Sequence, residues 1–151
     1  MIVGIDPGQR GGIAIIEGAN VVFISDMPQL HELVELLEKY KDKMERAFIE
    51  KQHTYPKQGV VSQGKLMKHY GELIGVLVAL RIPFEEVNPK RWQAFFFGTK
   101  RKKQTKKERK KASIAKAKSL FPNVEIGNRD GRAEALLIAE YGRNLIYGGE
   151  R

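Results

Sequence analysis

Two short apolar segments of this chain each end in an acidic residue, and this pattern limits the folds that the chain can form. Asp6 closes the run Met1–Ile5, and Glu50 closes the run Ala47–Ile49. Apolar runs of this length are typical of buried strands. If the two strands are adjacent and parallel, both acids emerge at the same carboxyl edge of a sheet. Open α/β sheets usually bind their ligands at that edge.

The rest of the chain alternates between strand and helix patterns. A helical pattern separates the first three expected strands from the strand that ends in Glu50, which favours a parallel crossover between that strand and the first one. We therefore expect an α/β fold, in which a five-stranded mixed sheet carries helices on both faces. The expected strands are Ile2–Ile5, Gly12–Ile16, Val21–Ser25, Arg46–Glu50 and Phe84–Val87, and the main expected helices are Gln29–Lys41, Ser62–Arg81 (with Val78 on its apolar side), Lys106–Leu120 and Asp130–Tyr147.

Two further acids lie near the end of the chain. Asp130 and Glu134 are four residues apart, so they share one face of the last expected helix. The apolar residues that follow should pack this face on the sheet, which would turn Glu134 inward. Asp130 could instead only stabilise the helix, because an acid in the first turn interacts favourably with the helix dipole. Taken alone, Asp6 could simply begin a turn, and Glu50 could be a surface residue.

Together, the four acids predict a metal site. Charged carboxylates are costly to bury unless they are paired, and a divalent cation would remove that cost. Oxygen-only ligands favour hard cations such as Mg²⁺ or Mn²⁺. Two such ions could activate a water and stabilise the departing oxygen of a displacement at phosphorus. We predict that Asp6, Glu50, Asp130 and Glu134 are the catalytic and metal-binding residues.

The positive charge of the chain is concentrated in one segment. Residues 100–111 contain nine of the 27 Lys and Arg and one of the 18 Asp and Glu. The remaining residues carry 18 basic and 17 acidic side chains and are nearly neutral. A local positive block of this kind is typical of proteins that bind a polyanion, although it could also be a solvated segment that aids solubility.

Several short motifs, in a consistent order along nearly the whole chain, resemble one known family. They are GIDPG at 4–8, FIEKQ at 48–52, VNPKRWQ at 87–93, SLFP at 119–122 and DGRAEALLIAEYG at 130–142. In these motifs the chain is similar to the RuvC-type Holliday junction resolvases of the ribonuclease H-like superfamily, and in particular to short phage-encoded members.

The resemblance implies a ribonuclease H-like fold over residues 1–151, forming one nuclease domain. It also implies a homodimer that cuts opposed strands of a four-way DNA junction with Mg²⁺ or Mn²⁺. Asp6, Glu50 and Glu134 match acids of the family pattern. Bacterial members carry another acid three residues before the position of Glu134, where this chain has Gly131, and Asp130 is the nearest acid.

We expect the basic block to contact DNA phosphates, which supply affinity more than base specificity. Tyr55, in the polar loop after Glu50, could stack on an unpaired base or could simply pack on Pro56. Trp92, with Phe95 and Phe96, is expected in the core. The expected DNA-binding residues are Tyr55, Lys100, Arg101, Lys102, Lys103, Lys106, Lys107, Arg109, Lys110 and Lys111.

Other functional classes are less compatible with the sequence. Without cysteine, disulfides and thiolate metal sites are excluded. No apolar run is long enough to span a membrane, and no secretory signal is visible, so we expect a cytoplasmic protein (in the host cytoplasm if phage-encoded). An actin-like or sugar-kinase-like ATP site would need a second phosphate loop, so no nucleotide cofactor is expected. A broader branched-DNA nuclease and a non-catalytic nucleic-acid-binding module stay open.

Overall fold

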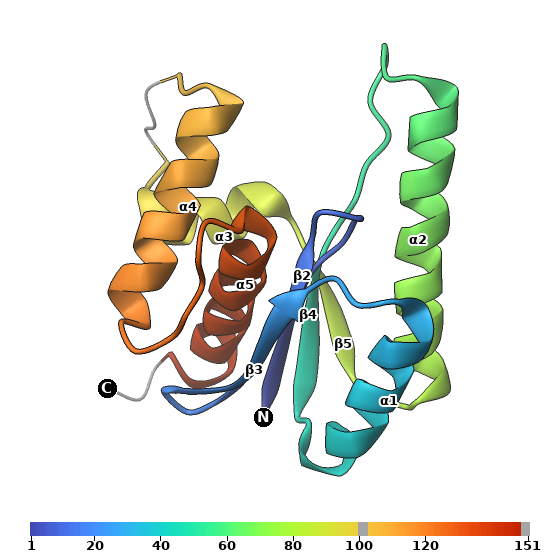
Figure 1. The fold of residues 1–151 in the computed structure, drawn as a ribbon, viewed down its shortest axis with the longest axis vertical. Helices are drawn as coiled ribbons and strands as arrows, with labels where there is room; N and C mark the ends of the chain where they lie inside the picture. Colours follow the sequence, from blue (N-terminus) through green and yellow to red (C-terminus); the bar gives the residue numbers. More distant parts are fainter. Residues whose placement is uncertain (100–102, 149–151) are drawn as a thin grey trace.

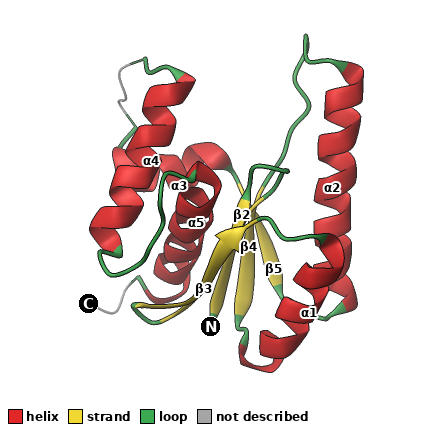
Figure 2. Cartoon of the chain, viewed as in Figure 1, coloured by secondary structure: helices red, strands yellow, loops and turns green. Residues whose placement is uncertain are grey.

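The structure of this chain is a computed structural model that describes residues 1–99 and 103–148 (Figure 1). Strands and helices follow one another in the order that the sequence predicts (Figure 2). The elements are β1 (Ile2–Asp6), β2 (Gly12–Glu17), β3 (Asn20–Asp26), α1 (Leu30–Tyr40), the 3₁₀ helix η1 (Lys41–Lys43), β4 (Arg46–Glu50), α2 (Val60–Ala79), β5 (Phe84–Val87), α3 (Pro89–Phe97), α4 (Lys106–Leu120) and α5 (Asp130–Tyr147).

The five strands form one mixed sheet in the order β3-β2-β1-β4-β5. The first three strands form an antiparallel meander, and β4 then pairs in parallel with β1 on one side and β5 on the other. The expected five-stranded mixed sheet and the parallel β1–β4 pairing are therefore confirmed. This pairing places the carboxyl ends of β1, β4 and β5 at one edge of the sheet.

Helices cover both faces of the sheet, as expected (Figure 1). Alternate residues of β1 point to opposite faces, with Ile2 in a core that includes α3, α4 and α5, and Val3 and Ile5 in a core that includes α1 and α2. The α5 backbone lies unusually close to β1, because a Cβ atom on Gly4 would stand only 2.0 Å from the carbonyl oxygen of Ala135. Glycine at position 4 is what permits this contact.

Three expectations for the helices need correction. The second helix begins at Val60 and ends at Ala79, so it starts two residues earlier than predicted. Val78, expected on its apolar side, is 60% exposed. Phe95 is 51% exposed and is not core, whereas Trp92 is fully buried as expected. For Val78 and Phe95, helical spacing predicts which face of the helix is apolar. It cannot show how far along the helix the neighbouring layer covers that face.

Candidate metal and nucleic-acid site

Asp6 and Glu50 lie side by side at the carboxyl edge of the sheet. They end the parallel strands β1 and β4, whose register pairs Ile5 with Ile49. Both acids lie on the face of the sheet that α5 covers, because Phe48, two residues before Glu50, packs in the α5 core. The predicted meeting of these two acids at one edge therefore follows from strand order and register.

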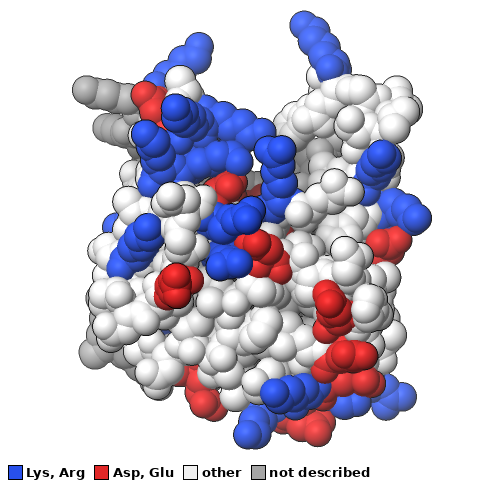
Figure 3. Space-filling model, in the orientation of Figure 1, with Lys and Arg blue, Asp and Glu red and all other residues white. Residues whose placement is uncertain are grey.

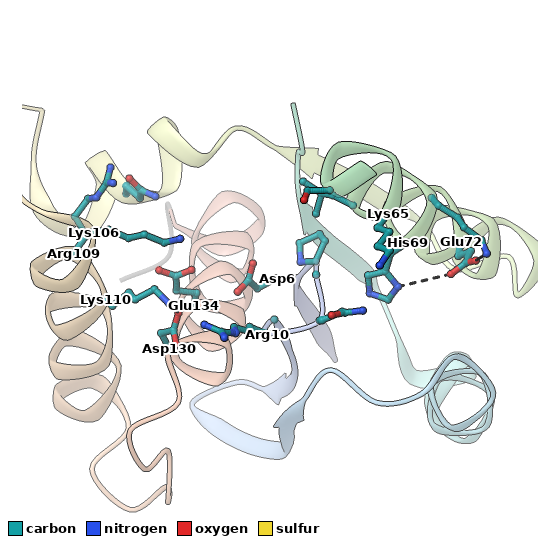
Figure 4. A pocket seen from close by; sticks show the side chains of 18 residues that line it. Asp6, Arg10, Lys65, His69, Glu72, Lys106, Arg109, Lys110, Asp130 and Glu134 are labelled. Carbon is teal, nitrogen blue, oxygen red and sulfur yellow. Dashed lines mark ion pairs between the residues drawn. The ribbon is translucent and has the colours of Figure 1, made fainter. Parts of the chain in front are cut away.

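The other two acids reach this edge from α5. Asp130 is the first residue of that helix and Glu134 lies one turn further along. The close approach of α5 to β1 brings Glu134 toward Asp6, and Figure 4 shows Asp6, Glu134 and Asp130 grouped at one end of a cleft. The charges of Glu134, Glu50 and Asp130 all act on Asp6.

Gly131 occupies the position where bacterial members of the resembled family carry an acid, and no side chain fits there. A Cβ atom at this position would stand 2.3 Å from the carbonyl oxygen of Arg10 and 2.5 Å from that of Gly11. The first turn of α5 thus packs directly on the loop after β1. Position 131 therefore cannot carry a carboxylate, and the first turn of α5 supplies Asp130, at the preceding position, instead.

Burial disfavours the charged forms of Asp6, Glu50 and Glu134, and repulsion from neighbouring acids adds to this effect at Asp6 and Glu134. Burial, and then the negative charges of Glu134, Glu50 and Asp130, raise the pKa of Asp6 well above its usual value, and Lys110 opposes this shift only in part. Burial and the charges of Glu50 and Asp130 raise the pKa of Glu134 to about 7, although Ser113 and Lys110 act in the opposite direction. Burial also raises the pKa of Glu50.

Three of the carboxylates have a specific partner on another helix. The indole Nε1 of Trp92 on α3 donates to Oε2 of Glu50 at 2.7 Å. The hydroxyl of Ser113 on α4 donates to Oε1 of Glu134 at 3.2 Å. Lys110 on α4 pairs with Asp130, with 2.6 Å between Nζ and Oδ2. The helices α3 and α4 thus hold the acids that the sheet and α5 supply.

The donor set suits a divalent cation by its chemistry. Within residues 1–99 and 103–148, no three His, Asp or Glu side chains, as they stand, form a group that could hold a metal ion. The four acids nevertheless offer only carboxylate oxygens and repel one another. A hard cation such as Mg²⁺ or Mn²⁺ prefers such ligands and would relieve the repulsion. The four carboxylates are therefore suitable ligands for a divalent cation, and binding would require their side chains to close around it.

Asp6, Asp130 and Glu134 line a cleft of about 1090 Å³, whereas Glu50 is not among its lining residues. The loop after β1 forms its floor, and α4 and α2 contribute opposite walls, as Figure 4 shows. Figure 3 shows Lys and Arg gathered on the α4 side of the hollow. Its ionisable lining residues are Asp6, Arg10, Lys65, Lys68, His69, Glu72, Lys106, Arg109, Lys110, Asp130 and Glu134.

The basic block divides into two groups along α4. Lys106, Arg109 and Lys110 line the cleft. Lys103, Lys107 and Lys111 are exposed but do not line it. Lys100, Arg101 and Lys102, which the sequence also predicts to bind DNA, lie outside the described residues. The helix starts inside this block because Thr105 and Glu108 form a reciprocal capping box.

The α2 wall of the cleft is a feature that the sequence analysis missed. Lys65, Lys68 and His69 face the cleft opposite the acids, and Arg10 enters it from the loop after β1. Residues 65, 68 and 69 are spaced so that they share one face of a helix. This spacing is the sequence pattern from which the basic α2 wall could have been predicted. These residues are dispersed among apolar ones, so they lack the local charge density that marks the basic block.

Tyr55 stands apart from the acids. Its side chain is 56% exposed, and its ring meets that of His53 edge to face at a centroid distance of 6.5 Å. It belongs to the loop between β4 and α2 and does not line the cleft. The structure therefore leaves this aromatic ring accessible near the start of α2.

Among the described residues, no helix is long and apolar enough to cross a membrane. No protein-family model and no curated protein matches the sequence.

Solved structures match the fold over nearly the whole chain. RuvC of Thermus thermophilus matches with a TM-score of 0.66 and 16% identity, covering 97% of this chain and 96% of that one. RuvC of T. thermophilus in complex with a Holliday junction substrate matches with a TM-score of 0.65 and 16% identity, covering 98% and 95%. Fowlpox virus resolvase in complex with substrate Holliday junction DNA matches with a TM-score of 0.55 and 15% identity, covering 94% and 97%.

Proposed function

The chain has the fold of the RuvC-type Holliday junction resolvases, and on this basis we propose that it is a metal-dependent endonuclease that resolves four-way DNA junctions. The observation that carries the proposal is the convergence of Asp6, Glu50, Asp130 and Glu134 beside a cleft lined with Lys and Arg. Such a site places cation ligands next to groups that attract phosphate.

The carboxylates would hold the metal. Asp6 interacts electrostatically with the other three acids, so it would be a central ligand of the bound metal. Bound divalent ions would activate a water and stabilise the departing oxygen of the phosphodiester. Asp6, Glu50 and Glu134 would bind and orient these ions, and Asp130 would complete the set. No side-chain nucleophile is then needed.

The cleft would hold the DNA backbone between two basic walls. Lys106 and Arg109 on α4 and Lys65 on α2 lie on opposite sides of the acids and can bind phosphates on either side of a scissile bond (Figure 4). Contacts of this kind position the backbone without reading the bases. This supports a nuclease that responds to the shape of branched DNA, so flaps and forks stay possible substrates beside four-way junctions.

Tyr55 is proposed as the residue that meets unpaired bases at the branch point. Its exposed ring, in a loop outside the cleft, can stack on a base, which contributes about 1–3 kcal/mol per base in comparable contacts. In a junction that carries a fluorescent base at the branch point, Tyr55→Ala should lower the opening signal while leaving phosphate-driven affinity nearly intact. An unaltered signal would remove Tyr55 from this role.

We also propose that the chain acts as a homodimer, because a four-way junction has two equivalent strands to cut. The exposed side of α2 supports this assembly, since Val60 and Val78 are 86% and 60% exposed and their spacing puts them on one side of the helix, with Gly71 between them. Replacing both valines by Arg should halve the mass measured by light scattering. A dimer of unchanged stability in this variant would show that this side of α2 is not the dimer interface.

The direct test of the proposed function is incubation with labelled four-way, flap and linear DNA, with and without Mg²⁺. We expect metal-dependent cleavage of the four-way junction in preference to linear DNA. Asp6→Asn should abolish cleavage but retain DNA binding, because it removes a cation ligand and leaves the basic walls intact. Tight binding with no cleavage by the unmodified protein in Mg²⁺ or Mn²⁺ would instead favour a non-catalytic binding module.

A further inference from the structure

We propose that Trp92 is a positioning residue, which holds the carboxylate of Glu50 in the orientation that cation binding requires. This inference rests on the proposed function, since it concerns one ligand of the proposed metal site. Trp92 is fully buried, and its indole Nε1 donates to Oε2 of Glu50 at 2.7 Å. The two residues are 42 positions apart in sequence, so only the fold brings them together.

The sequence of the β5–α3 junction explains how the indole reaches this position. Helix α3 starts directly after β5, where the Asn88 side chain accepts from the backbone N–H of Lys90 and Pro89 occupies the first helical position. Because β5 lies parallel and next to β4, the start of α3 stands beside the end of β4. A backbone hydrogen bond from Lys51 to Val87, at 2.8 Å, extends this pairing just past Glu50.

The indole is suited to orienting a ligand rather than to being one. Its N–H group can only donate, so it cannot bind a cation itself. It bonds one oxygen of Glu50, while the other has only a long contact of 3.4 Å, from Nε2 of Gln52. Trp92 therefore provides the firmer restraint on this carboxylate. Hydrogen bonds from outside the ligand set commonly orient metal ligands in this way, and their loss costs about 10–100-fold in metal affinity or activity.

A purely structural role for the same contact has to be distinguished. The indole also fills the core between the sheet and α5, and its N–H needs a partner when buried. In that case the bond would stabilise the fold without affecting the cation. The chain offers a clean way to separate the two roles, because Trp92 is its only tryptophan. Replacing all tryptophan by an analogue therefore changes one position.

The test is calorimetric titration of Mn²⁺ into three forms of the full chain: unmodified protein, protein with benzothienylalanine at position 92, and Trp92→Phe. Benzothienylalanine keeps the shape of tryptophan but carries sulfur in place of the N–H. We expect it to bind Mn²⁺ about 10-fold more weakly or worse, with an unchanged circular dichroism spectrum. Trp92→Phe should show at least the same loss. Unchanged Mn²⁺ affinity in the folded analogue protein would overturn the positioning role.

The same titration separates this inference from the proposed function. If the unmodified protein binds no Mn²⁺, both fail. If it binds Mn²⁺ and the analogue protein binds equally well, only the role of Trp92 fails. Fluorescence gives a second readout, because paramagnetic Mn²⁺ should quench the adjacent indole with the affinity found by calorimetry, and Asp6→Asn should remove that quenching. Mn²⁺ binding without any saturable quenching would contradict a site next to Trp92.

Discussion

Lys110 on α4 and Asp130 at the start of α5 form an ion pair, with 2.6 Å between Nζ and Oδ2. The pair joins the basic block on α4 to the acidic cluster that β1, β4 and α5 supply. Lys110 also lowers the pKa values of Asp6 and Glu134, which burial and like charges raise. Lys110 thus stabilises the charged forms of the acids, while Lys106 and Arg109 on the same helix line the cleft.

Lys110→Met should raise the pKa of Glu134 above its value of about 7, because a positive charge that lowers this pKa is lost. Proton binding would then compete more strongly with cation binding at neutral pH. Carbon-13 NMR titration of the glutamate carboxyls measures this shift. Lys107→Met is the matched control, since Lys107 does not line the cleft. Equal titration curves for the two variants would contradict a specific effect of Lys110.

The metal-free protein should lose stability as the pH rises from about 4.5 to about 7. The folded-state pKa of Glu134 is about 7, above the ordinary value of 4.5, so in this window the native state binds more protons than the unfolded chain. The free energy of unfolding therefore falls with pH, the opposite of the usual trend for a salt-bridged acid.

Urea denaturation in the presence of a chelator, repeated across this pH range, checks that expectation. Glu134→Gln should flatten the decline, because the glutamine carries no titratable proton. Adding Mn²⁺ at neutral pH should restore stability to the unmodified protein more than to the variant. A free energy of unfolding that rises with pH and is insensitive to Glu134→Gln would contradict the raised pKa.

The two sides of α4 should contribute unequally to DNA binding. Lys106 and Arg109 line the cleft, whereas Lys107 and Lys111 do not. Replacing Lys106 and Arg109 by Ala should reduce the slope of log affinity against log salt concentration by about 2, one for each lost phosphate contact. The Lys107→Ala, Lys111→Ala double variant removes the same charge and should leave the slope nearly unchanged. Equal slopes would mean that DNA does not bind in the cleft.

The contact of α5 with the sheet should tolerate no side chain at position 4. A Cβ atom there would stand 2.0 Å from a backbone oxygen of α5, so Gly4→Ala must push the helix away. We expect destabilisation of about 3 kcal/mol or more, together with loss of metal binding as Glu134 moves from Asp6.

Gly18→Asn is a suitable control for Gly4→Ala. Gly18 lies in the β2–β3 turn at φ 58°, a conformation that Asn tolerates, and open space surrounds it. This control should change the free energy of unfolding by about 0.5 kcal/mol or less. Thermal denaturation of both variants makes the comparison, and similar melting temperatures would contradict the tight packing.

Much of the fold could be predicted from sequence because local signals mark its elements. The bounds of β4, β5, α4 and α5 are confirmed as predicted. Thr105 caps the start of α4, Pro83 precedes β5 and Gly148 follows the end of α5. The crossover through α1 favours the parallel pairing of β1 with β4. The ribonuclease H-like fold that the motifs imply is confirmed by the matches to the RuvC structures.

The sequence could not predict contacts that depend on three-dimensional packing. Trp92 reads as an ordinary core residue, and nothing in the sequence indicates its bond to Glu50. The α2 wall of the cleft escapes notice because Lys65 and Lys68 are dispersed among apolar residues. Gly131 reads only as a missing acid, whereas the structure explains it by the Arg10–Gly11 backbone that passes at contact distance. The metal-binding and DNA-binding roles of all these residues stay predictions.

The most direct measurement of the central claim is the anomalous scattering of manganese in a crystal of this protein grown with Mn²⁺. We expect one or two manganese peaks enclosed by the carboxylates of Asp6, Glu50 and Glu134, with Asp130 beside them. These peaks should disappear in Asp6→Asn crystals. A map in which manganese lies elsewhere, or in which these carboxylates bind none at neutral pH, would contradict that claim.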